Sequence, residues 1–152
     1  MKISTKGRYA LRLMLDLAEN APESYVSLRD ISERQNISVK YSEQIVSLLC
    51  KRGLLKSSRG AQGGYMLSKK PSEYTVGEIL RVTEGNLAPI ACLRDAPNRC
   101  ERYATCGTIG FWEGLYETIR AYTDRYTLED LLREQQQKAG NACKNHNGKE
   151  GI

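Results

Sequence analysis

Apolar side chains recur every three or four positions along most of this chain, and that spacing predicts a mainly α-helical protein. Four of the predicted helices open on a hydroxyl side chain that can accept hydrogen bonds from the first free backbone amides. Those residues are Ser27, Ser38, Thr75 and Thr127. The predicted helices span residues 4–21, 27–35, 38–52, 75–85, 108–126 and 127–138.

The segments 27–35 and 38–52 are joined by a very short connection, which is the helix-turn-helix pattern. An apolar stripe in the second segment is formed by Tyr41, Ile45, Leu48 and Leu49. Its outward side chains are short, amide-bearing or charged, and such groups read base edges in the major groove. They are Val39, Lys40, Glu43, Gln44 and Ser47. Taken alone, the segment also fits an ordinary amphipathic surface helix.

Two short strand-like runs follow, on either side of a glycine-rich turn at Gly60, Gly63 and Gly64. We interpret them as a β-hairpin wing with Arg59 at its tip, since an arginine on a thin hairpin can enter a minor groove. A phosphate-cradling glycine loop is excluded because no Lys-Ser or Lys-Thr pair follows the glycines. A surface hairpin without a function remains an alternative. The candidate DNA-binding residues are Ser38, Lys40, Tyr41, Glu43, Gln44, Arg59 and Gly60.

The formal net charge of +5 is distributed unevenly. Residues 1–85 carry 14 Lys and Arg against 9 Asp and Glu, whereas residues 86–152 carry 9 of each. The excess therefore indicates a polyanionic partner for the N-terminal part. No targeting or membrane segment is predicted, because Arg12 and Asp16 interrupt the first apolar run. We expect a cytosolic protein with no membrane partner.

Helical periodicity disappears between residues 86 and 107, a segment long enough to suggest a function. It carries Cys92, Cys100 and Cys106, separated by seven and five residues. Thiolates bind soft or borderline metals, and this loose spacing suits an iron–sulfur cluster, which is larger than one ion. Zinc sites more often show paired two-residue spacings, which the loop lacks. Three incidental cysteines are the alternative.

Three arginines beside these cysteines would stabilise thiolates or offset the negative charge of a ligated cluster. They are Arg94, Arg99 and Arg102. Of the other cysteines, Cys50 is predicted to be a small core residue. Cys143 and His146 have a possible ligand spacing, but the surrounding composition favours incidental placement. An odd total of five cysteines argues against a disulfide framework in a reducing compartment.

Apolar residues in segment 108–126 alternate by three and four, as in a coiled-coil seam. They are Trp112, Leu115, Ile119, Tyr122 and Tyr126. A helix of about 28 Å is too long for its own small domain to cover, so we expect it to pack against the same helix of a second subunit. Packing onto the chain's own core is the alternative.

The predicted fold is mainly α with a small β-hairpin wing: a winged helix-turn-helix DNA-binding domain plus a long dimerisation helix. Residues 1–85 would form the DNA-binding domain and residues 86–107 a cysteine loop for cluster binding. Residues 108–138 would hold the dimerisation helix and a C-terminal helix. Residues 139–152, rich in Asn, Gly and Lys, are predicted to be a disordered tail.

Several runs resemble the iron–sulfur cluster regulators of the IscR type, within the wider Rrf-type winged-helix repressors, to about residue 135. The resemblance implies a homodimer with helix 38–52 in the major groove of a two-fold related DNA site and Arg59 in the minor groove. It also implies a cluster, usually [2Fe–2S], on the three loop cysteines, whose occupancy alters promoter choice, typically at cluster-assembly genes. Glu43 matches a position tied to promoter discrimination. The runs are Met1-Lys-Ile-Ser-Thr-Lys-Gly-Arg-Tyr-Ala, Asp30-Ile-Ser-Glu-Arg-Gln-Asn-Ile-Ser, Glu43-Gln, Gly53-Leu, Arg59-Gly-Ala-Gln-Gly-Gly-Tyr and Val76-Gly-Glu-Ile.

Two departures leave the fourth cluster ligand open. The first cysteine gap is two residues longer than in the enterobacterial type, and that type's histidine is replaced by Ile109. Some relatives instead take the fourth ligand from an acidic residue near the N-terminus of the partner subunit, and the matching position in this chain is Arg8. Glu43 would be the most consequential ligand, because ligation would turn it away from DNA. The candidates are Glu43, Asp95, Glu101 and His146.

The sequence thus predicts a transcriptional regulator, by expectation a repressor, rather than an enzyme. No acid–base constellation or activated nucleophile is present, and the one His lies in the tail. One alternative is a metal-free thiol redox sensor that regulates sulfur metabolism or oxidative stress. A small iron–sulfur electron carrier is a second, although it would have no need of a basic helix-turn-helix and wing. A zinc-stabilised protein-interaction module is a third.

Overall fold

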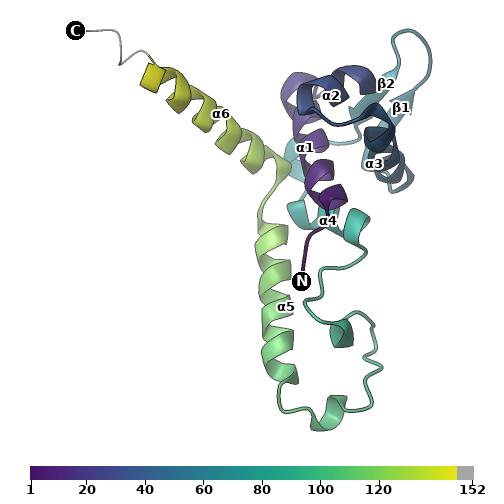
Figure 1. Ribbon diagram of the computed structural model, residues 1–152, viewed down its shortest axis with the longest axis vertical. Helices are drawn as coiled ribbons and strands as arrows, with labels where there is room; N and C mark the ends of the chain where they lie inside the picture. The colour runs from purple at the N-terminus through teal and green to yellow at the C-terminus, as the bar shows by residue number, and fades with distance from the viewer. Residues whose placement is uncertain (147–152) are drawn as a thin grey trace.

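The structure is a computed structural model that describes residues 1–146 (Figure 1). Three helices begin the chain: α1 (Thr5–Asn20), α2 (Leu28–Gln35) and α3 (Val39–Lys51). The antiparallel hairpin of β1 (Leu55–Ser58) and β2 (Gly64–Leu67) follows, and then α4 (Val76–Glu84). This arrangement confirms the predicted winged helix-turn-helix domain with its small β-hairpin.

The helix starts coincide with the predicted caps. The Ser27 and Ser38 hydroxyls accept hydrogen bonds from the amides of Asp30 and Tyr41, three residues further on. Asn36 lies in the left-handed region at φ 51°, which ends α2 and allows the abrupt turn into α3. Side-chain capping satisfies amides that the helices cannot, so local sequence sets these boundaries.

The core of the domain is mainly aliphatic, with Tyr74 as its one buried aromatic side chain among residues 1–146, and it lies between α1, α2, α3, α4, the hairpin and the start of the last helix. α3 buries a different stripe from the predicted one, because Ser42 and Val46 are buried whereas Tyr41 and Leu48 are half-buried. The reason is that α3 packs against α1, α2, α4 and β1 at once, and that environment favours the row Ser42, Ile45, Val46, Leu49.

The last two helices, α5 (Ile109–Arg125) and α6 (Leu128–His146), meet at an elbow beside the start of α4. Val76 N donates to Tyr126 O at 2.9 Å, and Leu128 N donates to Tyr74 O at 3.0 Å. Leu128 is fully buried in the core. From this elbow α5 runs away from the winged-helix domain, and α6 leads off in another direction (Figure 1).

α6 extends beyond Lys138, where the sequence places its end, to His146. Residues 139–146 are therefore helical rather than disordered, because Gly140 lies within the helix without ending it. Residues 147–152, the remainder of the predicted tail, lie outside the described residues. Within residues 1–146, no helix combines the length and apolar character needed to cross a membrane.

Candidate functional site

The exposed face of α3 carries most of the predicted base-reading side chains. Lys40, Glu43 and Gln44 are exposed, and Ser38 is exposed at the N-cap. Tyr41 is half-buried instead, with its ring edge-to-face against Tyr9 of α1 at a centroid distance of 5.8 Å. The first two turns of α3 thus present polar groups of several kinds outward, as direct readout of base edges requires.

A buried polar network fixes α2 against α1 behind this face. The carboxylate of Asp16, 1% exposed, accepts from Arg34 Nη2 at 2.6 Å and from Gln35 Nε2 at 2.9 Å. The hydrogen bond to Asp16 raises the pKa of Arg34, against the opposing effect of burial. Arg12 of α1 also donates to the backbone carbonyl of Gln35. Sequence reasoning missed the network, although a carboxylate inside the apolar face of 4–21 is a signal that a buried partner exists.

The wing is braced along β2, near its tip, by the chain that precedes α2. Val26 and Tyr65 exchange two backbone hydrogen bonds of 2.9 Å, which add a short bridge to the outer edge of β2. Arg59 and Gly60 lie exposed at the tip, where Gly60 has φ 104° and its carbonyl accepts from Gly63 N at 3.0 Å. The hairpin therefore displays Arg59 as an exposed cation at the end of a braced loop.

Several cations along α3 and the wing have no carboxylate partner among residues 1–146. In the described part of the chain, the ion pairs of the winged-helix domain involve other residues, such as Arg34 with Asp16 and Lys69 with Glu78. Among the described residues of α3 and the wing, the exposed cations outside these ion pairs are Lys40, Lys51, Arg52, Lys56 and Arg59. Free positive charge on one surface is what phosphate binding needs.

The cysteine loop, residues 86–107, is ordered by local hydrogen bonds and two short 3₁₀ turns, Ala91–Leu93 and Tyr103–Thr105. Asn98 Nδ2 donates to Cys92 O at 2.6 Å, and Asn98 Oδ1 accepts from Cys100 N at 2.8 Å. Cys92 is exposed, and Cys100 is half-buried. One amide side chain therefore connects the backbones of two of the three cysteines.

Cys106 is half-buried where the loop meets α5. Its Sγ lies 3.4 Å from Thr108 Oγ1. The Thr108 hydroxyl, followed by the backbone amides of Thr108 and Ile109, lowers the pKa of the Cys106 thiol below its ordinary value. By contrast, Cys50 packs against the core as predicted, and burial raises the pKa of its thiol.

The three loop cysteines do not converge on a metal-sized site. Among the described residues, no group of three or more Cys, His, Asp or Glu side chains is arranged to hold a metal ion. Of the candidate fourth ligands, Asp95 lies 4.0 Å from Arg99, and Glu101 is exposed. Glu43 lies on α3 near the wing, where it adds to the effects of burial and of Cys50 that raise the pKa of Tyr65. The His146 side chain lies outside the described ones. As arranged here, these residues do not fit a preformed cluster site.

α5 has no buried residue, although its sequence is rich in large apolar side chains. Of the predicted seam, Trp112, Ile119 and Tyr126 are half-buried, whereas Leu115 and Tyr122 are 37% and 56% exposed. Phe111, which the seam pattern missed, is 67% exposed and packs edge-to-face on Trp112. Within the described residues, the main packing of α5 onto the chain's own domain is against α4, and Leu115, Tyr122 and Phe111 stay exposed in the single chain.

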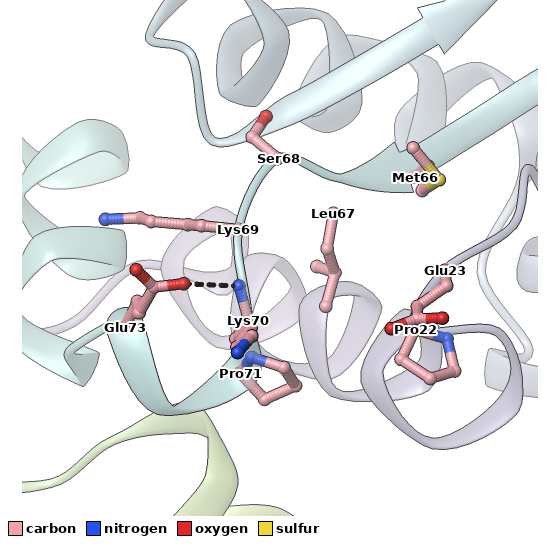
Figure 2. Close-up of a pocket in the computed structure, with 9 residues that line it drawn as sticks. All are labelled: Pro22, Glu23, Met66, Leu67, Ser68, Lys69, Lys70, Pro71 and Glu73. Carbon is pink, nitrogen blue, oxygen red and sulfur yellow. Dashed lines mark hydrogen bonds between the residues drawn. The ribbon is translucent and has the colours of Figure 1, made fainter.

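A hollow of about 490 Å³ lies at the far end of β2 from the wing tip, between the α1–α2 connection and the turn before α4 (Figure 2). Pro22 and Met66 line it, and Glu73 Oε2 accepts from Lys70 N at 2.8 Å. That bond caps the 3₁₀ turn Pro71–Glu73, so these polar groups already have a structural role.

Comparison with known proteins bears on the whole chain. A family model described as "Rrf2: Iron-dependent Transcriptional regulator" matches residues 3–134. The Rrf2 protein of Nitratidesulfovibrio vulgaris is 38% identical over 94% of this chain and 95% of its own. The solved structure of CymR, "the Global Cysteine Regulator of B. subtilis", is 40% identical with a TM-score of 0.72, over 88% of this chain and 98% of that one. The structure of T. potens IscR is 39% identical with a TM-score of 0.73, over 91% and 90%. These relatives are transcription regulators rather than enzymes.

Proposed function

This chain belongs to the Rrf2 family of DNA-binding transcriptional regulators, and on that premise we propose that it acts as a homodimer whose two winged-helix domains read a two-fold related DNA site. α3 enters the major groove with Lys40, Glu43 and Gln44 toward base edges. Arg59 enters the adjacent minor groove from the wing. The observation that carries this proposal is the combination of an exposed polar face on α3 with unpaired cations along α3 and the wing.

The proposed dimer forms through α5. In a single chain, Phe111 and the exposed part of the apolar seam are in contact with water, which is unfavourable in free energy. Packing two copies along this face covers the surface and holds two reading domains at a constant separation. The proposed place of action is the cytosol, where the DNA partner is available.

We further propose that the cysteine loop is the sensing element. The IscR relatives favour a [2Fe–2S] cluster on Cys92, Cys100 and Cys106. The regulated genes would then be those for cluster assembly, and the proposed mode of regulation is repression. Because the three cysteine side chains do not converge in this structure, the loop must rearrange to hold a cluster. The second candidate is a metal-free thiol sensor, which is favoured by the lowered pKa of the Cys106 thiol and by the CymR relatives.

The DNA proposal is tested with the Arg59→Ala variant. Genomic fragments retained by the wild-type protein first identify an operator. Fluorescence anisotropy at two salt concentrations then compares affinities. The expected result is weaker operator binding by about tenfold or more, since a specific arginine contact is worth roughly 1–3 kcal/mol. Arg133→Ala on α6 is the matched control, because it removes the same charge from an exposed site outside the winged-helix domain. Equal affinity and sequence preference in Arg59→Ala and wild type would contradict the wing assignment.

Iron and sulfide analysis and visible absorbance of protein purified without oxygen distinguish the cluster sensor from the thiol sensor. A cluster predicts iron, acid-labile sulfide and visible absorbance that disappear in Cys→Ala variants of the loop. An unchanged spectrum in Glu43→Ala would exclude Glu43 as a ligand. Absence of iron and sulfide after reconstitution, with operator affinity that responds to thiol oxidation, would establish the thiol sensor instead.

A further inference from the structure

We propose that Tyr103 is the positioning residue that couples the cysteine loop to α5, through the hydrogen bond its phenol donates to Glu113. This inference rests on the proposed sensing role of the loop. Tyr103 Oη lies 2.6 Å from Glu113 Oε1, in the second turn of α5. A hydrogen bond to an ionised carboxylate is among the stronger kinds, and its geometry is directional.

Tyr103 is also tied to two of the cysteines by its backbone. Its amide donates to Cys100 O at 3.0 Å, and its carbonyl accepts from Cys106 N at 3.4 Å. The remaining cysteine is connected through Asn98, which bonds both Cys92 and Cys100. A change at any of the three thiols that displaces the local backbone must therefore move Tyr103 or break these bonds.

Away from the junction at Cys106 and Thr108, a cavity separates the loop from α5. Its volume is about 390 Å³. Its loop side is formed by Leu93, residues 95–98 and Tyr103, and its helix side by Glu113, Tyr116, Glu117 and Arg120. Within the described residues, Cys106 contacts Thr108 and Ile109 where the loop runs into the helix, and beyond that junction Tyr103–Glu113 is the one side-chain hydrogen bond or ion pair between residues 86–107 and α5. The loop has room to shift, and this bond is where a shift acts on α5 beyond its first residue.

The other end of α5 is attached to the reading domain. Arg81 of α4 bonds Asp124 at 2.8 Å, and the Tyr126 carbonyl accepts from Val76 N. α5 is continuous between Glu113 and these attachments, so it transmits a displacement as a rod. Movement of the N-terminal end of α5, next to the loop, changes the angle between α5 and the reading domain. In a dimer built on α5, that angle determines the spacing of the two α3 helices.

The test uses the full chain and its operator. Iodoacetamide alkylation of the loop thiols is the probe, and every protein carries Cys143→Ser because that thiol is exposed as well. Mass spectrometry confirms modification at Cys92, Cys100 and Cys106 but not at Cys50. The ratio of operator affinities before and after alkylation is measured for wild type, Tyr103→Phe, Glu113→Gln and the double variant. We expect each single variant to shrink the wild-type ratio by about two- to tenfold, and the double variant to shrink it no further.

Tyr116→Phe is the matched control, since it removes a phenol oxygen on the same cavity without a hydrogen bond to the loop. Its ratio should equal that of the wild type, and the unmodified variants should all bind DNA alike. Hydrogen exchange supplies a second readout: alkylation should alter exchange in the first turns of α5 in wild type but not in Tyr103→Phe. A wild type that does not respond to alkylation overturns the sensing role and this inference with it. A wild type that responds no more than Tyr103→Phe overturns this inference alone.

Discussion

At the scale of single residues, the Cys106 thiol should ionise more readily than an ordinary cysteine. Its pKa is lowered chiefly by the Thr108 hydroxyl, which stabilises the thiolate. We predict that Thr108→Val returns the pKa toward its ordinary value. The pH profile for alkylation of Cys106 then moves to higher pH, and the rate at neutral pH falls several-fold. Site-resolved mass spectrometry of iodoacetamide labelling across a pH series measures this.

Thr105→Val is the matched control, because the Thr105 hydroxyl donates to the Arg102 carbonyl rather than to the thiol. Its profile should coincide with that of the wild type. If Thr108→Val and wild type shared one midpoint, the hydroxyl would have no part in the reactivity of Cys106.

Other residues show which contacts can be predicted from the sequence and which cannot. The caps Ser27 and Ser38 were predictable, since each bonds an amide three positions away in the chain. The partner of Asp16 was not, because Arg34 lies eighteen residues away and is brought close only when α2 packs on α1.

At the scale of elements, the wing depends on Gly64. This residue has φ 147°, and a Cβ there would strike the Val26 carbonyl that pairs with Tyr65. We predict that Gly64→Ala breaks the bridge between the wing and the chain before α2. It should destabilise the domain by about 1–3 kcal/mol and weaken operator binding, because Arg59 loses its braced support. Urea unfolding and fluorescence anisotropy measure the two effects.

Gly140→Ala in α6 is the control, since nothing lies within 4 Å of a Cβ there. A helical glycine exchanged for alanine should leave stability unchanged or raise it by up to about 1 kcal/mol. Unaltered stability and DNA affinity in Gly64→Ala would show that the contact between β2 and the chain before α2 tolerates a side chain.

At the scale of the whole molecule, α5 is the proposed centre of assembly. We predict that Leu115→Glu converts the proposed dimer to a monomer, because a carboxylate in the middle of the seam cannot be buried without a partner. Size-exclusion chromatography with light scattering reports the mass. Operator affinity should fall at least tenfold, since two linked reading domains bind more tightly than one.

Ala121→Glu is the matched control. It adds the same charge to an exposed position of α5 outside the predicted seam, and it should leave both the mass and the affinity unchanged. A Leu115→Glu protein that remains dimeric would place the subunit interface elsewhere.

Most helix starts, the hairpin and the class of fold were predictable from local sequence, because caps, turn glycines and apolar periodicity act over a few neighbouring residues. Tertiary structure alone decided which distant groups meet. It brought Asp16 to Arg34 and Tyr103 to Glu113, and it attached the α5–α6 elbow to the start of α4. It also left Cys92, Cys100 and Cys106 apart, although their spacing suits a common ligand. The physical reason is that spacing along a chain limits how far apart two side chains can lie, whereas packing and hydrogen bonding between elements determine whether they converge.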